Sequence, residues 1–250
     1  MSLLVEVAID AVIAGGEAVM SMRGCAVSWK ADGSPVTDGD RFADEAIRRI
    51  LRRADPGTPI ISEESGGAVP DHGAFWLVDP LDGTKEFVAG VPEFTVNVAL
   101  VTDGHPGLGV IFAPATGELF AGAAGRGACR NRQPISVRPP PPGGSLVLTS
   151  RSHCNEATVR SWLHPGTGAR LECCGSSLKF CRIAQGSADL YPRFGPTMEW
   201  DTAAGQAVLE AAGGSVRTLE GAPLGYGKEG LRNPPFVASG SCLDPSSPPS

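Results

Sequence analysis

One segment, residues 76–87, constrains this chain more than any other, because an apolar stretch leads directly into two carboxylates. Residues 76–78 are Trp, Leu and Val, and residues 79–84 read Asp-Pro-Leu-Asp-Gly-Thr. The apolar residues predict a buried strand, and the proline and glycine predict that it ends in a turn. Because Asp, Pro and Gly also form ordinary surface turns, this segment alone does not establish a functional site.

Further acidic residues stand where other predicted elements begin or end. Glu63 and Glu64 follow a short apolar run, Asp201 opens a predicted helix, and Asp40 lies in the first turn of another helix. Asp201 and Asp40 have structural explanations as well: an Asp N-cap stabilises a helix by about 1 kcal/mol, and the helix dipole favours an acid in the first turn. Layered α/β folds nevertheless collect their site residues at strand ends and helix starts.

The acids in these places indicate a bound cation, because carboxylates brought together repel one another unless a positive charge compensates them. Carboxylate, carbonyl and water ligands suit Mg²⁺, which often shares a substrate phosphate. The seven cysteines and four histidines are scattered and lack the spacing of a zinc site. The pattern therefore predicts metal-assisted phosphate chemistry, with the cysteines present as reduced thiols.

The order of predicted elements indicates two halves. Apolar periodicity predicts helices over 3–22 and 38–53, then strands over 59–62, 75–79, 94–102, 108–113 and 118–122. Four consecutive prolines within 138–144 interrupt the pattern, which predicts a boundary between a half spanning 1–137 and a half spanning 145–240. The second half alternates between strand 145–149, helices 155–163 and 176–186, strand 188–191, helix 201–212, and strands 214–218 and 235–239. The serine- and proline-rich tail, 241–250, is predicted to be disordered.

The charge balance narrows the range of partners. With 27 acidic and 21 basic residues the formal net charge is −6, which disfavours binding to a nucleic-acid polymer. No apolar run reaches the roughly 18–20 residues that cross a bilayer, and the first ten residues lack the basic region of an export signal. We therefore expect a cytoplasmic protein without a transmembrane segment.

Together these motifs resemble the inositol monophosphatase superfamily, whose members are Mg²⁺-dependent, lithium-sensitive phosphatases. The resemblance rests on residues 63–64, 79–84 and 200–205. Additional segments are similar to the bisphosphate nucleotidases of this superfamily, namely 32–37, 81–87, 93–97, 175–181 and 191–197. The resemblance implies an α+β fold, a layered α/β/α/β/α sandwich of two packed halves with the site between them.

Carried over residue by residue, the resemblance implies three groups of site residues. The metal ligands would be the carboxylates of Glu63, Asp79, Asp82 and Asp201 and the main-chain carbonyl of Leu81. The residues that activate water would be Thr84 and Asp40, with Glu63 and Glu64 sharing that work. The substrate contacts would be Gly83, Thr84, Lys85, Gly175, Ser176, Ser177, Lys179, Arg193 and Asp201, where helix-start amides, hydroxyls and cations suit a phosphate.

The resemblance also implies a reaction and a substrate. Water would attack a phosphomonoester in line, without a phosphoenzyme, with two or three Mg²⁺ ions at the site and inhibition by lithium. The implied substrate is adenosine 3′,5′-bisphosphate, cut at the 3′ position to AMP and phosphate, with 3′-phosphoadenylyl sulfate as a second substrate, in support of sulfate assimilation. The same resemblance allows peripheral contact with the inner face of the cell membrane and either a monomer or a homodimer.

Three alternatives stay open at this point: an inositol monophosphatase, a sugar bisphosphatase of the same fold, and a non-catalytic sensor of metal or nucleotide. The intact carboxylate set together with Thr84 argues against the sensor. A phosphatase that forms an aspartyl-phosphate is disfavoured, because its two acids would be separated by one residue, whereas two residues separate Asp79 from Asp82.

Overall fold

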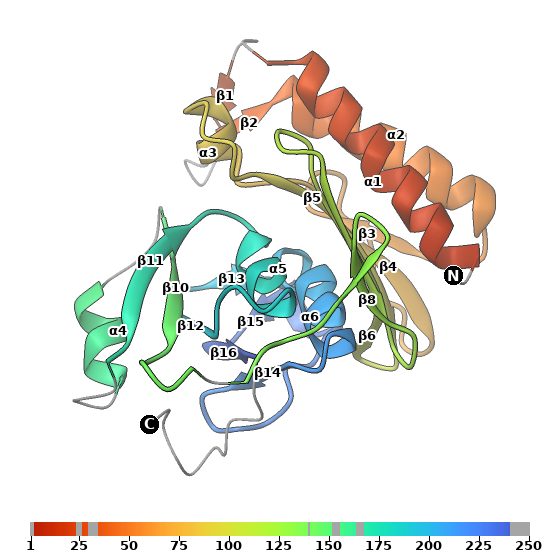
Figure 1. Cartoon of the computed structure of the whole chain (residues 1–250). Coiled ribbons are helices and arrows are strands. Elements are labelled where there is room, and N and C mark those ends of the chain that lie inside the picture. The colour runs from red at the N-terminus through yellow and green to blue at the C-terminus, as the bar shows by residue number, and fades with distance from the viewer. Residues whose placement is uncertain are drawn as a thin grey trace.

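The computed structural model describes residues 3–23, 27–29, 35–139, 141–151, 156–163 and 168–240, and in these ranges the chain forms five layers. Across the molecule the layers are, in order, a pair of helices, a seven-stranded sheet, a second pair of helices, a five-stranded sheet and a single outer helix (Figure 1). The expected layered α/β/α/β/α fold is confirmed by this order.

The first layer consists of α1 (Leu3–Ser21) and α2 (Asp38–Ala54), which pack against each other. The apolar face of each helix is buried in one cluster with the outer face of the seven-stranded sheet, for example through Val12, Ile47 and Val96. The two helices therefore cover the side of the sheet that faces away from the second half. A short antiparallel pair, β1 (Val27–Trp29) and β2 (Pro35–Thr37), leads into α2.

The seven-stranded sheet follows the order of the chain: β3 (Ile60–Ser62), β4 (Ala74–Asp82), β5 (Thr95–Thr102), β6 (His105–Ala113), β7 (Glu118–Ala123), β8 (Gly127–Arg130) and β9 (Gln133–Ile135). All neighbours are antiparallel except β3 and β4, which run parallel with Ser62 opposite Val78. Because the carboxyl ends of parallel strands meet at one edge, Glu63 comes to lie beside Asp79. The short helix α3 (Thr84–Val88) follows β4 directly.

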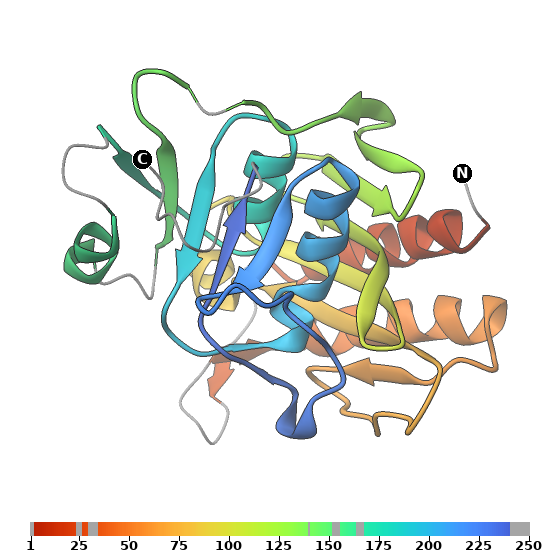
Figure 2. The ribbon, with the colours of Figure 1, turned by 90° about the horizontal axis from the view of Figure 1, so that it is seen from below.

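The five-stranded sheet has the order β11 (Arg170–Cys174), β10 (Leu146–Ser150), β12 (Leu190–Arg193), β16 (Phe236–Ser239) and β14 (Ser215–Thr218). Two helices, α5 (Leu178–Ala184) and α6 (Ala203–Ala211), lie between the two sheets (Figure 2). The helix α4 (Glu156–Trp162) packs on the outer face of the five-stranded sheet. Shorter elements complete the half: β13 (Thr197–Met198), the 3₁₀ turn η1 (Glu199–Asp201), η2 (Glu229–Leu231) and β15 (Arg232–Asn233).

Most of the predicted elements are confirmed to within a few residues, and the differences have physical reasons. The helix predicted over 201–212 begins only at Ala203, because residues 199–201 form a separate 3₁₀ turn, in which Asp201 accepts the main-chain N–H of the preceding Met198. Strands β8, β9 and β11 were not predicted. They lie at or next to sheet edges, and their exposed polar residues break the apolar alternation that marks a strand.

The division into two halves at 137 and 145 stays a prediction, and the core runs across it. One cluster of buried side chains includes Phe75 and Ile111 from the first sheet and Phe180, Leu209 and Phe236 from the second half. The described residues between 138 and 144 form neither helix nor strand, and the predicted tail, 241–250, lies outside the described residues. Among the helices that the structure describes, none is both long and apolar enough to cross a membrane.

Candidate active site

Three carboxylates from separate parts of the chain converge at the edge where β3 and β4 end. Glu63 follows β3, Asp79 lies in β4, and Asp201 ends η1 in the second half. One oxygen of each side chain lies within 4.8 Å of the others. Asp79 is 1% exposed, whereas Glu63 and Asp201 keep an opening to solvent. The structure thus brings together three of the four predicted carboxylate ligands as a group that could hold a metal ion.

The cluster is electrostatically unfavourable without a cation. Burial raises the pKa of Asp79 well above its ordinary value, and the nearby charges of Glu63, Asp82 and Asp201 raise it further. The pKa of Asp201 rises to about 8, mainly through removal of water and secondarily through the charge of Asp82. A divalent cation would relieve both effects, because it compensates the charges and replaces the lost water as a partner. An all-carboxylate set of this kind fits Mg²⁺.

The fourth predicted ligand, Asp82, lies beside this group and connects the two halves. Its Oδ2 accepts the main-chain N–H of Ser177 at 2.5 Å and longer hydrogen bonds of 3.5 Å from Thr95 and Asn97. Burial raises the pKa of Asp82, and the ammonium group of Lys179 opposes that shift. The orientation of this carboxylate is therefore fixed by groups from both halves of the protein.

Thr84 and Asp40 lie in contact, as the predicted water-activating pair requires. The Thr84 hydroxyl is 3.3 Å from Oδ1 of Asp40 and 3.2 Å from the carbonyl oxygen of Leu81. The other oxygen of Asp40, Oδ2, accepts both the N–H and the hydroxyl of Thr37 at 2.7 Å, which is the capping box at the start of α2. The cap thus orients the buried Asp40 so that Oδ1 faces Thr84. Glu64 is half-buried next to Glu63.

The turn between β4 and α3 brings main-chain groups to the same place. Gly83 has φ +90° there, a left-handed conformation that favours glycine, and a Cβ at this position would lie 3.1 Å from the carbonyl oxygen of Glu93. The N–H groups in the first turn of α3 have no partners within the helix. Lys85 follows on this helix with an exposed side chain.

The predicted substrate contacts 175–177 form a tight turn between β11 and α5. Ser176 has φ +48°, which is uncommon for a residue with a side chain. The Ser177 hydroxyl is buried and lies 2.8 Å from both Thr95 Oγ1 and Asn97 Oδ1. The turn is therefore attached to β5 by the side chain of Ser177 and to Asp82 by the main chain of the same residue.

Two cations predicted to hold substrate are buried. Lys179 is 4% exposed, and its ammonium group donates to the carbonyls of Cys174 and Ser176 and lies 4.9 Å from the ring centre of Tyr191. Burial lowers its pKa, which the charge of Asp82 opposes. Arg193 is 9% exposed and donates from one terminal nitrogen to the carbonyl of Pro196, while its buried Nε has no protein partner. Both side chains thus support nearby main chain, and their role toward substrate stays a prediction.

Sequence reasoning assigned no role to Thr37, Glu93, Thr95 and Asn97, which hold the site residues in place. Thr95 and Asn97 are 0% and 1% exposed, although both are polar. They stand two residues apart on one face of β5, so their position in an otherwise apolar strand was a signal that could have found them. Polar side chains buried in a strand need partners, and these lie at Asp82 and Ser177.

The sequence and the fold of this chain are similar to those of known proteins. The inositol monophosphatase family matches residues 1–242. The 3′(2′),5′-bisphosphate nucleotidase CysQ of Escherichia coli K12 is 45% identical over 235 residues, which are 90% of this chain and 94% of the relative. The crystal structure of CysQ from Bacteroides thetaiotaomicron, 36% identical, superposes with a TM-score of 0.82 over 94% of this chain and 96% of that one. An inositol monophosphatase from Anabaena, 31% identical, gives 0.80 over 95% and 90%.

Proposed function

Because the chain belongs to the inositol monophosphatase family, we propose that it is a 3′(2′),5′-bisphosphate nucleotidase. It hydrolyses the 3′-phosphate of adenosine 3′,5′-bisphosphate to AMP and phosphate and acts in the same way on 3′-phosphoadenylyl sulfate. The convergence of Glu63, Asp79 and Asp201 is the observation that carries an enzymatic function, and the 45% identity to the E. coli nucleotidase supports the substrate. As part of this proposal, we expect the protein to be located in the cytoplasm and to be a monomer or a homodimer.

The metal in this proposal is Mg²⁺, in two or three sites. Glu63, Asp79, Asp82 and Asp201 would hold it through carboxylates and Leu81 through its carbonyl oxygen, which supports the fit because all are oxygen donors. When bound, Mg²⁺ activates water and stabilises negative charge on the phosphate and leaving oxygens. The remaining steps fall to the side chains and main chain of the protein.

In this mechanism the attacking water gives a proton to Thr84 Oγ1, and the proton that Thr84 already carries passes to Oδ1 of Asp40. Thr84 Oγ1 donates to Oδ1 of Asp40, so its lone pair is free to accept a proton from water on the opposite side. Asp40 holds the hydroxyl in that orientation because Thr37 occupies its other oxygen. In this proposal Glu63 and Glu64 share the work of orienting water.

The phosphate that reacts lies, in this proposal, against the main-chain N–H groups of Gly83 and Thr84 at the start of α3. Such groups are oriented toward an anion without any side-chain rearrangement. The rest of the nucleotide would contact Lys85, Gly175, Ser176, Ser177, Lys179, Arg193 and Asp201. The turn 175–177 would supply N–H and hydroxyl donors, and Lys179 at the start of α5 and Arg193 at the end of β12 would supply the positive charge, for the phosphate that is not cleaved.

The test compares phosphate release from adenosine 3′,5′-bisphosphate, inositol 1-phosphate and fructose 1,6-bisphosphate in the presence of Mg²⁺. We expect the nucleotide to give the highest kcat/KM, with loss of turnover on adding lithium or chelator. The variant Asp82→Asn removes one ligand charge and should abolish turnover while the protein stays folded. A preference for the inositol or sugar ester would replace the substrate assignment, and binding of Mg²⁺ and nucleotide with no phosphate released over hours would establish a sensor.

A further inference from the structure

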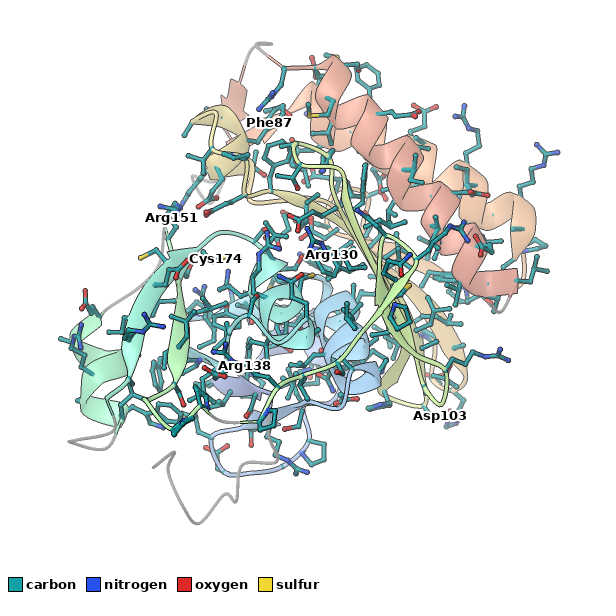
Figure 3. The ribbon with its side chains drawn as sticks, in the orientation of Figure 1. Phe87, Asp103, Arg130, Arg138, Arg151 and Cys174 are labelled. Atoms are coloured by element: carbon teal, nitrogen blue, oxygen red, sulfur yellow. The ribbon has the colours of Figure 1, made fainter. Side chains whose placement is uncertain are left out.

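A second carboxylate network bridges the two halves next to the site, and its centre is Glu93. Glu93 lies between α3 and β5 in the sequence, and its two carboxylate oxygens accept hydrogen bonds from Nε and Nη2 of Arg151, both at 2.8 Å. Glu93 also binds main chain, because its Oε2 accepts the N–H of Gly175 at 2.7 Å. Arg151 also donates to the carbonyl of Cys173, and Figure 3 shows it beside Cys174 on the side of the second half that faces α3.

The backbone around Gly175 transmits this contact to the site. A Cβ at Gly175 would lie 2.6 Å from the carbonyl oxygen of Glu93, so these two segments of backbone touch there without room for a side chain. Two residues later the N–H of Ser177 donates to Asp82 at 2.5 Å. Ser176 between them has φ +48°, a conformation that persists only where neighbouring contacts fix it.

We infer that Glu93 is a positioning residue for the Asp82 carboxylate. By accepting the Gly175 N–H it holds the turn 175–177 against β5 and α3, which keeps the Ser177 N–H on Oδ2 of Asp82 and leaves Oδ1 for a metal ion. Arg151 fixes Glu93 in turn through a bidentate ion pair. Groups that orient a metal ligand from outside commonly change metal affinity by 10–100-fold when removed.

A simple tether between the halves would behave differently from this positioning role. Exchanging the two charges, with Glu93→Arg and Arg151→Glu in one protein, restores an ion pair between the same two sites. It also places a guanidinium, which has no acceptor, opposite the Gly175 N–H. The exchange therefore preserves a tether but removes the acceptor that positions the turn.

Binding of Mg²⁺ to the whole protein, measured by isothermal titration calorimetry without nucleotide, tests the inference directly. We expect Glu93→Ala to weaken Mg²⁺ binding about tenfold or more. Arg151→Met, which leaves the Glu93 carboxylate on Gly175, should weaken it about threefold or less, and Glu93→Gln, which keeps an acceptor oxygen, should restore most of the affinity. The double charge exchange should stay as weak as Glu93→Ala. Wild-type affinity in Glu93→Ala, or its recovery in the double exchange, would overturn the positioning role.

The control and the fold are monitored separately. Glu6→Gln breaks another bidentate Arg–Glu pair, between α1 and the turn after β8, and should leave Mg²⁺ affinity unchanged. Thermal unfolding without Mg²⁺ reports whether each variant is folded, and if Glu93→Ala is not, the order of wild type, Glu93→Gln and the double exchange still decides. The inference rests on the proposed function only for the identity of the metal: a wild-type protein that binds Mg²⁺ but releases no phosphate would refute the nucleotidase and leave this test intact.

Discussion

Two buried acids on the seven-stranded sheet, Glu118 and Asp79, have opposite electrostatic surroundings. Glu118, 6% exposed at the start of β7, accepts both terminal nitrogens of Arg182 at 2.7 and 2.8 Å and lies 2.9 Å from Arg130. The Arg182 hydrogen bond lowers the pKa of Glu118, against the effect of burial. Asp79, 1% exposed, is surrounded by other acids, and its pKa is raised.

The two acids thus differ in role: Glu118 stabilises the fold, whereas Asp79 belongs to the group that the proposed function assigns to a metal site. Glu118 joins β7 to α5, and its negative charge is compensated by Arg182 and Arg130 when the chain folds. The charges nearest to Asp79 are mainly acidic, and the proposed function supplies their compensation through a cation from solution. A buried like-charge group without cations lowers stability and is retained where function requires it.

The largest effect should follow from neutralising the uncompensated group. Asp79→Asn removes the charge of a proposed metal ligand but keeps an oxygen that can accept the Leu81 N–H, a bond of 3.1 Å in the structure. We expect kcat to fall by about 10³-fold or more, while the metal-free protein unfolds at a higher temperature because repulsion is relieved. Phosphate release and thermal unfolding in chelator measure the two changes. Retained turnover, or a lower unfolding temperature, would contradict the contrast with Glu118.

The opposite pattern is expected for the compensated acid. Glu118→Gln leaves Arg182 and Arg130 facing a neutral amide, and we expect it to lower the free energy of unfolding by about 2 kcal/mol. The kcat/KM of the folded protein should stay within about twofold of wild type. Urea denaturation and steady-state assays check this, and a selective loss of turnover at unchanged stability would place Glu118 in the site instead.

The pH dependence of stability should distinguish the two kinds of acid. Asp201 has a pKa of about 8 in the folded protein against an ordinary value of 3.8, so the folded state binds more protons between these values and stability falls as the pH rises from about 4 to 8. Glu118, with its lowered pKa, contributes stability above its ordinary value of 4.5 that is lost as the pH falls further. In chelator, the unfolding temperature should therefore drop by several degrees from pH 5 to pH 8.

Adding Mg²⁺ should reverse that drop, and more strongly at pH 8 than at pH 5, because the ion competes with protons for the same carboxylates. Thermal unfolding across this pH range, with and without Mg²⁺, is the measurement. Curves that do not change with Mg²⁺ at pH 8 would show that the acids are not a metal site.

The smallest effect is expected at the surface. Glu6 and Arg132 form a bidentate pair at 3.1 and 3.4 Å, with side chains 40% and 64% exposed. Water screens such a pair, so Glu6→Gln should lower the free energy of unfolding by less than about 0.5 kcal/mol. A loss as large as that for Glu118→Gln would mean that burial does not separate these ion pairs.

The sequence predicted the elements that carry the acids, because the strands predicted over 59–62 and 75–79 end next to Glu63 and at Asp79, and strand ends meet at sheet edges. The parallel pairing of β3 with β4 that brings them together is a property of the folded sheet. The contacts of Asp82 could not be predicted, because Ser177 lies 95 residues away and reaches it only after the two halves pack. The burial of Lys179 depends in the same way on Tyr191 and the turn 174–176.

The proposed ligand set is divided between segments on both sides of a proline-rich joint, residues 138–144, with Glu63 and Asp79 before it and Asp201 after it. Neither fragment of a chain cut within 138–144 would possess a complete set of donors. Recovery of metal affinity on mixing the two fragments would therefore report their reassociation, and the joint offers a natural place to build a split reporter from this protein.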